Sequence, residues 1–170
     1  MMYRIATVLT LLLLASAAPK ADEAAVNALL ARDTPPPGVV FELVENDHEA
    51  LQTLLPRIRA YISALRARHP DMGMAVVSHG NEQFSLTRAQ RDARAELHAA
   101  VEGLVRDADV EVAVCATYAG WRDVSPEDFP DYVQVAESAP ARINDFRALG
   151  YEVIRLRPPG ADTGIPDDDW

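Results

Sequence analysis

The sequence is poor in cysteine and in positive charge, and each shortage excludes a class of protein. A single cysteine, Cys115, excludes an intrachain disulfide framework and any zinc or iron–sulfur site that one chain builds from several thiolates. Only 16 Lys and Arg residues stand against 26 Asp and Glu residues, so the formal net charge is −10. Because nucleic-acid-binding proteins need a basic face to neutralise phosphates, this balance argues against a nucleic-acid partner.

Length and hydrophobic content are typical of one globular domain. The chain has 170 residues, of which 49% are hydrophobic. Single domains usually have about 100–200 residues, and a chain of this size buries a substantial core. This composition also argues against a disordered chain.

Residues 1–21 have the layout of a secretory signal peptide with its cleavage region. Arg4 provides a positive start, residues 5–14 are apolar apart from two Thr, and Ala15, Ser16 and Ala17 are small residues suited to cleavage. The apolar run is too short for a membrane anchor. We therefore expect a periplasmic or secreted protein that is free of the membrane after cleavage. An uncleaved anchor or a wrong start codon is the alternative interpretation.

Short apolar runs alternate with helical patterns along the rest of the chain. Residues 22–37 predict a short helix followed by a proline-rich linker, and the compact domain is expected over residues 38–157. Runs rich in β-branched residues predict five strands, at residues 39–44, 74–78, 110–115, 132–135 and 151–156. Residues 158–170 show no periodicity and predict an acidic disordered tail.

Helix-start signals lie between these strands. Asn46 precedes Glu49, and Thr87 precedes Gln90, in patterns typical of capping boxes, while Pro56 predicts a kink or a later helix start. Further helices are expected after Ser125 and after Ser138, the second of them ending at Gly150. Strands that alternate with helices predict an α/β fold, a three-layer α/β/α sandwich around a mostly parallel five-stranded sheet.

Ligands of open parallel sheets bind beyond the carboxyl ends of the strands, so the residues that follow each strand are the candidates for a site. Glu45 and Asn46 follow the first predicted strand. The candidates after the second and third strands are His79, Gly80 and Asn81, and then Cys115, Thr117, Tyr118 and Trp121. Of all these rim residues, Cys115 and His79 carry the most reactive side chains, and we predict them as the catalytic pair.

Each candidate also has a structural interpretation. Cys115 is either a small core residue at the end of a strand or a nucleophilic, sulfur-carrying thiol. His79 either bonds a backbone group or assists the thiolate of Cys115. Trp121 either packs the loop or a subunit contact, or it lines a pocket. The four histidines, His48, His69, His79 and His98, lack ligand spacing, and neither a phosphate loop nor a readable acid pair is present, so we predict no metal and no cofactor.

The same residues resemble the DsrE/DsrF-like family. The resemblance covers residues 38–156, and its most specific elements are the His79-Gly80 pair after the second strand and Cys115 after the third. It is also carried by the run Val76-Val77-Ser78, by residues 112–114, by the turn at residues 126–129 and by residues 143–151. It implies a small α/β protein that forms trimers or hexamers, with Cys115 as the sulfur-bearing residue and His79 as its rim neighbour.

The resemblance implies a thiol-based persulfide carrier or sulfurtransferase-like protein rather than a conventional turnover enzyme. Sulfur donor and acceptor proteins would be its partners, and export favours a role with inorganic sulfur compounds outside the cytoplasm. Many relatives have Gly or Asn after the cysteine, whereas this chain has the bulkier Ala116, Thr117 and Tyr118. The alternative is a non-catalytic oligomeric protein, either ligand-binding or scaffolding, with a structural cysteine. Tyr118, Trp121 and residues 129–132 are the expected subunit contacts.

Overall fold

The computed structural model describes residues 20–159, and its strands form one parallel sheet. The strands are β1 (Gly38–Leu43), β2 (Gly73–Ser78), β3 (Val110–Cys115), β4 (Gln134–Ala136) and β5 (Glu152–Arg155). Their order is β4-β3-β2-β1-β5, and every neighbouring pair is parallel. The predicted α/β fold is therefore confirmed. The predicted signal peptide and most of the predicted tail lie outside the described residues.

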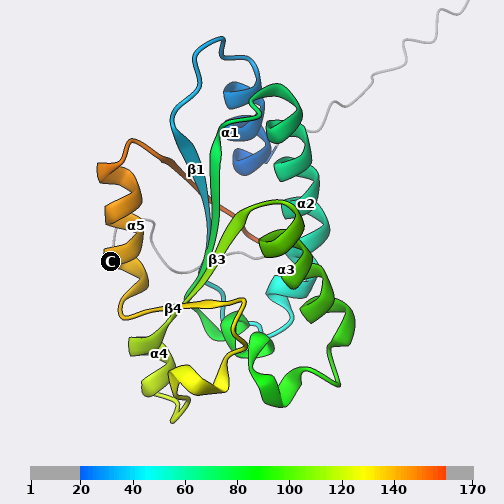
Figure 1. The fold of residues 1–170 in the computed structure, drawn as a ribbon, viewed down its shortest axis with the longest axis vertical. Helices are drawn as coiled ribbons and strands as arrows, with labels where there is room; N and C mark the ends of the chain where they lie inside the picture. The colour runs from blue at the N-terminus through cyan, green and yellow to red at the C-terminus, as the bar shows by residue number, and fades with distance from the viewer. Residues whose placement is uncertain (1–19, 160–170) are drawn as a thin grey trace, which may run out of the picture.

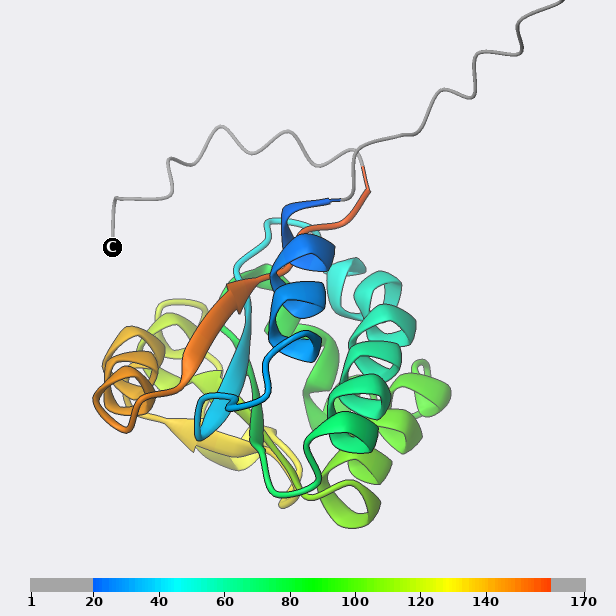
Figure 2. The same cartoon turned by 90° about the horizontal axis from the view of Figure 1, so that it is seen from above.

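Helices cover both faces of this sheet (Figures 1 and 2). One face carries α1 (Ala21–Leu30), α2 (Ala50–Arg68) and α3 (Ala95–Asp107). The other face carries α5 (Ala139–Ala148), and the short α4 (Ala116–Gly120) follows β3 directly. The part of the chain that the structure describes also contains three 3₁₀ turns: η1 (Asn81–Leu86), η2 (Arg88–Gln90) and η3 (Pro126–Asp128).

The strands are apolar on both faces because each face packs against a helix layer. Alternate β1 residues, Val39, Phe41 and Leu43, join the larger core under α1, α2 and α3. Val40 points to the smaller core under α5, together with Ala75, Val77, Ala113, Cys115, Ala139, Ile143 and Phe146. Cys115 therefore lies where the smaller core meets the carboxyl end of the sheet.

The predicted start of α2 is wrong, although its buried face is right. The helix begins at Ala50, Asn46 provides no cap, and Pro56 lies within the helix instead of starting it. The Asp47 side chain accepts the Glu49 backbone N–H at 2.9 Å, which replaces the expected Asn46 cap. The predicted apolar positions are all buried, namely Leu51, Leu54, Leu55, Ile58, Ile62 and Leu65.

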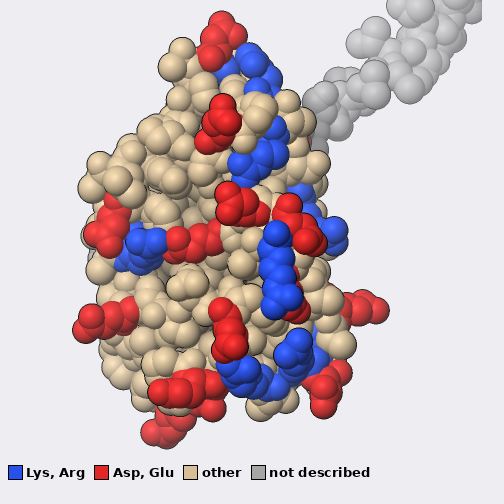
Figure 3. All heavy atoms as spheres, viewed as in Figure 1, with Lys and Arg blue, Asp and Glu red and all other residues tan. Residues whose placement is uncertain are grey.

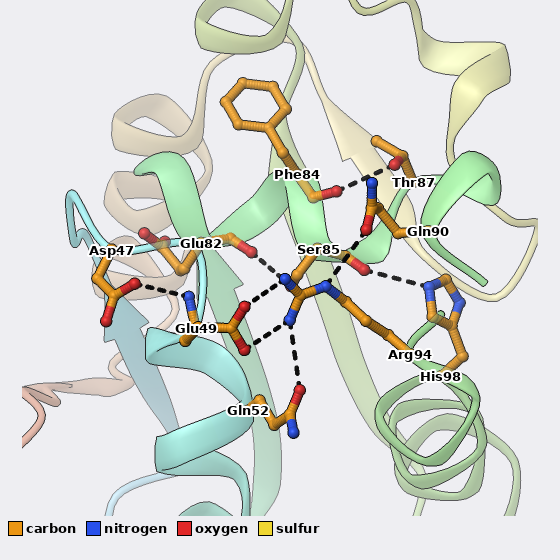
Figure 4. Close-up of polar contacts among 10 residues, drawn as sticks. All are labelled: Asp47, Glu49, Gln52, Glu82, Phe84, Ser85, Thr87, Gln90, Arg94 and His98. Carbon is orange, nitrogen blue, oxygen red and sulfur yellow. Dashed lines mark hydrogen bonds and ion pairs between the residues drawn. The ribbon is translucent and has the colours of Figure 1, made fainter. Parts of the chain in front are cut away.

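The predicted capping box at Thr87 and Gln90 does not start α3, which begins at Ala95. The Thr87 hydroxyl instead donates to the Phe84 carbonyl at 3.0 Å, and the Gln90 side chain accepts from Arg94 at 3.4 Å (Figure 4). Both side chains are thus engaged elsewhere, and η2 forms in place of a first helical turn. The Arg94 guanidinium also reaches Glu49 and Gln52, which joins α3 to the start of α2.

The segment before α5 differs from the prediction by two residues. β4 begins at Gln134, because Tyr132 is buried and bonded to the His98 ring at 2.6 Å. Phe129 is only 2% exposed, so Phe129 and Tyr132 contribute to the core, while Asp131 between them is exposed. Ser138 caps α5 by accepting the Ala141 N–H at 3.4 Å, and Gly150, with φ of 86°, follows its end as predicted.

Charges of both signs lie interspersed over the face shown in Figure 3. Several of them form ion pairs, such as Arg142 with Glu111 at 2.6 Å. Within residues 20–159, no helix combines the length and the apolar content needed to cross a membrane.

Candidate functional site

A pocket of about 300 Å³ lies beyond the carboxyl ends of β1, β2 and β3. It brings together all of the predicted rim residues except Asn81, and its lining comprises Val44, Glu45, Asn46, His79, Gly80, Cys115, Thr117, Tyr118, Trp121, Ser138 and Pro140. Asn81 supports the wall from behind: its side chain accepts from the Tyr118 hydroxyl at 2.8 Å and donates to the Asn46 carbonyl at 3.0 Å. The parallel sheet thus assembles the site at the edge where such sheets bind ligands.

Larger hollows lie elsewhere over residues 20–159. They have volumes of about 810 Å³ between α2 and α3, about 650 Å³ beside β5, and about 410 Å³ beside the linker before β1. None of these three is lined by a cysteine, and His69, which lines the third, is bonded to the Leu29 carbonyl at 3.1 Å. The smaller pocket at Cys115 is therefore the candidate for chemistry.

Cys115 is the last residue of β3 and lies deep in this pocket. It is 5% exposed, and its backbone N–H donates to the Gln83 side chain at 2.8 Å. Its Sγ accepts the backbone N–H of Tyr118 at 3.5 Å. A backbone donor at a sulfur atom favours negative charge on that atom, as a reactive thiolate requires.

His79 directly follows β2 and is bonded to a carboxylate of β1. Its Nε2 donates to Glu42 Oε1 at 3.0 Å, and its backbone N–H donates to the Leu43 carbonyl at 3.0 Å. Burial raises the pKa of Glu42, but the hydrogen bond and charge of His79, with Arg155 and Arg147, outweigh it, and the net pKa lies below the ordinary value. The Glu42 carboxylate therefore fixes the orientation of the imidazole ring in the pocket wall.

One glutamate of the site, Glu82, was not predicted. Glu82, in η1, is fully buried and accepts from the Ser78 hydroxyl at 2.8 Å and the Gly80 N–H at 2.9 Å. Its second oxygen accepts the Glu45 N–H at 2.8 Å. Glu82 thus holds the backbone of Glu45, which lines the pocket, and this contact could not be read from residue spacing. Burial raises the pKa of Glu45 and the charge of Glu82 raises it further, against smaller opposing effects of Arg155 and Arg157.

An aromatic wall closes the outer side of the pocket. The Tyr118 ring lies 5.9 Å from the Trp121 ring and 5.8 Å from the Phe84 ring, measured between centroids. The Arg122 guanidinium lies over Tyr118 at 5.5 Å. Trp121 is 71% exposed, so this wall presents an aromatic surface to solvent as well as to the cavity. Residues 20–159 contain no group of three or more side chains suited to hold a metal ion.

Comparisons with known proteins bear on the fold. No protein-family model matches the sequence, and no curated protein sequence matches it. Among solved structures, the protein of unknown function MTH1491 from Methanobacterium thermoautotrophicum matches with a TM-score of 0.56 and 21% identity, over 69% of this chain and 97% of that one. The YchN protein from E. coli matches with a TM-score of 0.52 and 16% identity, over 70% of this chain and 99% of that one. At these identities the likeness shows the fold alone, and that fold is the DsrE/DsrF-like α/β fold that the sequence resembles.

Proposed function

We propose that this protein is an exported, thiol-based sulfur carrier that holds a persulfide on Cys115. The observation that carries the proposal is the position of the Cys115 sulfur, which lines a pocket with His79 and accepts the Tyr118 N–H at 3.5 Å. The DsrE/DsrF-like fold supports the same reading. Fold likeness by itself does not determine chemistry, so the site bears the argument.

Loading is a sulfur exchange that needs no added oxidant. The Cys115 thiolate attacks the terminal sulfur of a hydropersulfide, R–S–SH, and a new S–S bond forms as the old one breaks. The products are Cys115–S–SH and R–S⁻, which leaves with the electron pair of the broken bond. An acceptor thiolate then attacks the terminal sulfur of Cys115–S–SH in the same way and restores the Cys115 thiolate.

The pocket suits a small sulfur donor. Its volume of about 300 Å³ equals roughly ten water molecules at liquid density. Cys115 is 5% exposed, so a bound persulfide is shielded from bulk solvent while the pocket gives small molecules access. The Tyr118 N–H and the His79 ring are the polar groups that would stabilise negative charge on the sulfur.

A second interpretation of Cys115 and its pocket rests on a different observation. Cys115 packs in the smaller core with Ala113, Ala139 and Ile143, as a structural cysteine does. On this reading the pocket binds a small ligand without covalent chemistry, or the protein is a scaffold.

Mass spectrometry separates the two readings. Protein incubated with inorganic polysulfide is expected to gain one sulfur atom per chain, and reductant should remove it. Cys115→Ser should abolish the gain, while Thr53→Ala, a change at an exposed position of α2 outside the pocket, should retain it. A wild-type protein that gains no sulfur, together with a large loss of stability in Cys115→Ser, would assign the cysteine to the core.

Export and assembly belong to the same proposal. The layout of residues 1–21 supports a mature chain that begins between Ala18 and Asp22. N-terminal sequencing of protein from the periplasm or medium should find that start, and recovery of Met1 from the cytoplasm would contradict it. A trimer or hexamer would place the exposed Trp121 in an interface beside the pocket.

A further inference from the structure

Glu45 has a buried carboxylate oxygen that lacks a partner among residues 20–159. The residue follows β1 and is 8% exposed. Its Oε1 atom is buried and forms no hydrogen bond with the residues the structure describes. A buried polar atom without a partner is destabilising, and natural proteins rarely keep one without a reason. Because Glu45 lines the same pocket as Cys115, a ligand in that pocket is the partner within reach.

The backbone of Glu45 is fixed on both sides, which keeps its side chain at the pocket. Its N–H donates to Glu82 Oε2 at 2.8 Å, and its carbonyl accepts the Asn81 N–H at 2.7 Å. Gly80 packs so closely that an added Cβ atom would lie 2.4 Å from the Glu45 backbone. The backbone of this segment is therefore held in place, and the Glu45 side chain lines the pocket from a fixed position.

We infer that Glu45 selects the ligand of this pocket by charge: its neutral carboxyl group binds a small anionic sulfur compound beside Cys115, and its ionised form repels it. A neutral carboxyl group has an O–H donor, which an anionic sulfur accepts, whereas a carboxylate only accepts hydrogen bonds. The sulfur chemistry of this ligand rests on the proposed function, while the charge selection does not.

The surroundings of Glu45 favour the neutral form. Burial is the largest effect that raises the pKa of Glu45, and the charges of Glu82 and Asp47 add to it, whereas Arg155 and Arg157 oppose it. The other titratable groups that line the pocket are His79, which is bonded to Glu42, Cys115, and Tyr118, whose hydroxyl donates to Asn81. As pH rises through the raised pKa, the pocket gains a negative charge and its affinity for anions falls.

Two alkylating reagents of nearly equal size measure this charge at Cys115. In both cases the thiolate attacks the CH₂ carbon, an S–C bond forms, and iodide leaves with the electron pair of the C–I bond. Iodoacetate is anionic and iodoacetamide is neutral, so the ratio of their rate constants cancels the thiolate fraction. This ratio reports the electrostatic potential in the pocket.

We expect the ratio of the iodoacetate rate constant to the iodoacetamide rate constant to fall in the wild-type protein between about pH 5 and pH 9. This fall should be roughly tenfold larger than the fall in Glu45→Gln. The variant keeps an uncharged hydrogen-bonding group in the same place. The other groups of the pocket are the same in both proteins, so the difference between the two profiles isolates Glu45. Glu137→Gln changes the net charge equally at an exposed position and should follow the wild-type profile. Should Glu45→Gln fail to fold, Glu45→Met removes the charge with a similar side-chain size.

Each outcome of this experiment either supports or overturns charge selection by Glu45. Parallel ratio profiles in the wild-type protein and Glu45→Gln would overturn the inference. Failure of both reagents to alkylate the folded protein would overturn it together with the proposed function, since the pocket would then not reach the sulfur. If the ratio falls more steeply with pH in the wild-type protein than in Glu45→Gln, but polysulfide adds no sulfur to the protein, charge selection by Glu45 is supported and the sulfur-carrier proposal is overturned.

Discussion

Gly80, at the turn after β2, is a position where alanine has no room. A Cβ atom there would lie 2.4 Å from the Glu45 backbone N and O atoms and 2.4 Å from Glu82 Oε2. The φ angle of Gly80, −101°, is one that any residue adopts, so glycine is required here for space rather than for conformation. Two of these three atoms belong to the backbone and cannot rotate away.

We expect Gly80→Ala to lower the free energy of unfolding by roughly 2–5 kcal/mol. Overpacking at such a site costs about 1–3 kcal/mol. Displacement of Glu45 also weakens its bonds to Glu82 and Asn81, and a buried polar group without its partner costs about 1–3 kcal/mol. The smaller entropy of the unfolded alanine chain offsets about 0.4–1 kcal/mol.

Urea denaturation of the wild-type protein, Gly80→Ala and Gly103→Ala measures this effect. Gly103→Ala is the matched control, because Gly103 lies within α3 and its added Cβ atom would meet only Asp107 Oδ2, at an ordinary 3.6 Å. That control should raise stability by about 0.5–1 kcal/mol, as alanine does in a helix interior. Equal stability of Gly80→Ala and the wild-type protein would refute the tight packing of the pocket floor.

Three further changes test other parts of the structure. Burial is the main cause that lowers the pKa of His98, so the folded protein keeps this ring neutral while the unfolded chain takes a proton near pH 6.5. Stability should therefore fall as pH drops below about 6.5, by at most about 1.4 kcal/mol per pH unit, and urea titrations of His98→Gln should lack this part of the slope. Ser138→Ala removes the α5 cap and should lower the free energy of unfolding by about 0.5–1 kcal/mol in urea titrations. An unchanged free energy of unfolding would show that the cap does not stabilise the protein. Trp121→Ser should shift light scattering from an oligomer toward a monomer without loss of stability, and a monomeric wild-type protein at micromolar concentration would contradict the proposed assembly.

The strands could be predicted from the sequence because they are buried on both faces. Residues 39–44 and 110–115 are apolar at every position except Glu42 and Glu111, and a strand covered by helices on both sides has such a composition. The rim position of Cys115 and His79 followed from the same pattern, since parallel strands end at one edge.

The acidic part of the site could not be predicted in the same way. A glutamate in a sequence most often lies in solvent, and Glu82 is buried because Ser78, Gly80 and the Glu45 N–H surround it in space. The predicted start of α3 was wrong for a similar reason, because the Thr87 hydroxyl donates to the Phe84 carbonyl instead of capping a helix. Of Glu45 and Glu82, only Glu45 could be named as a candidate from the sequence, because it directly follows the first predicted strand.

The strand order β4-β3-β2-β1-β5 has a consequence for the order in which the chain folds. Val39, near the start of the sheet, pairs with Glu152, near the end of the described chain. A contact between such distant positions carries a large loop-closure entropy, so β1 keeps an open edge until the last strand has been synthesised. The β1–β2 and β2–β3 pairs need only the helices between them. A nascent chain thus forms the strands that bear His79 and Cys115 first, and until β5 arrives it exposes an edge that templates pairing with other chains.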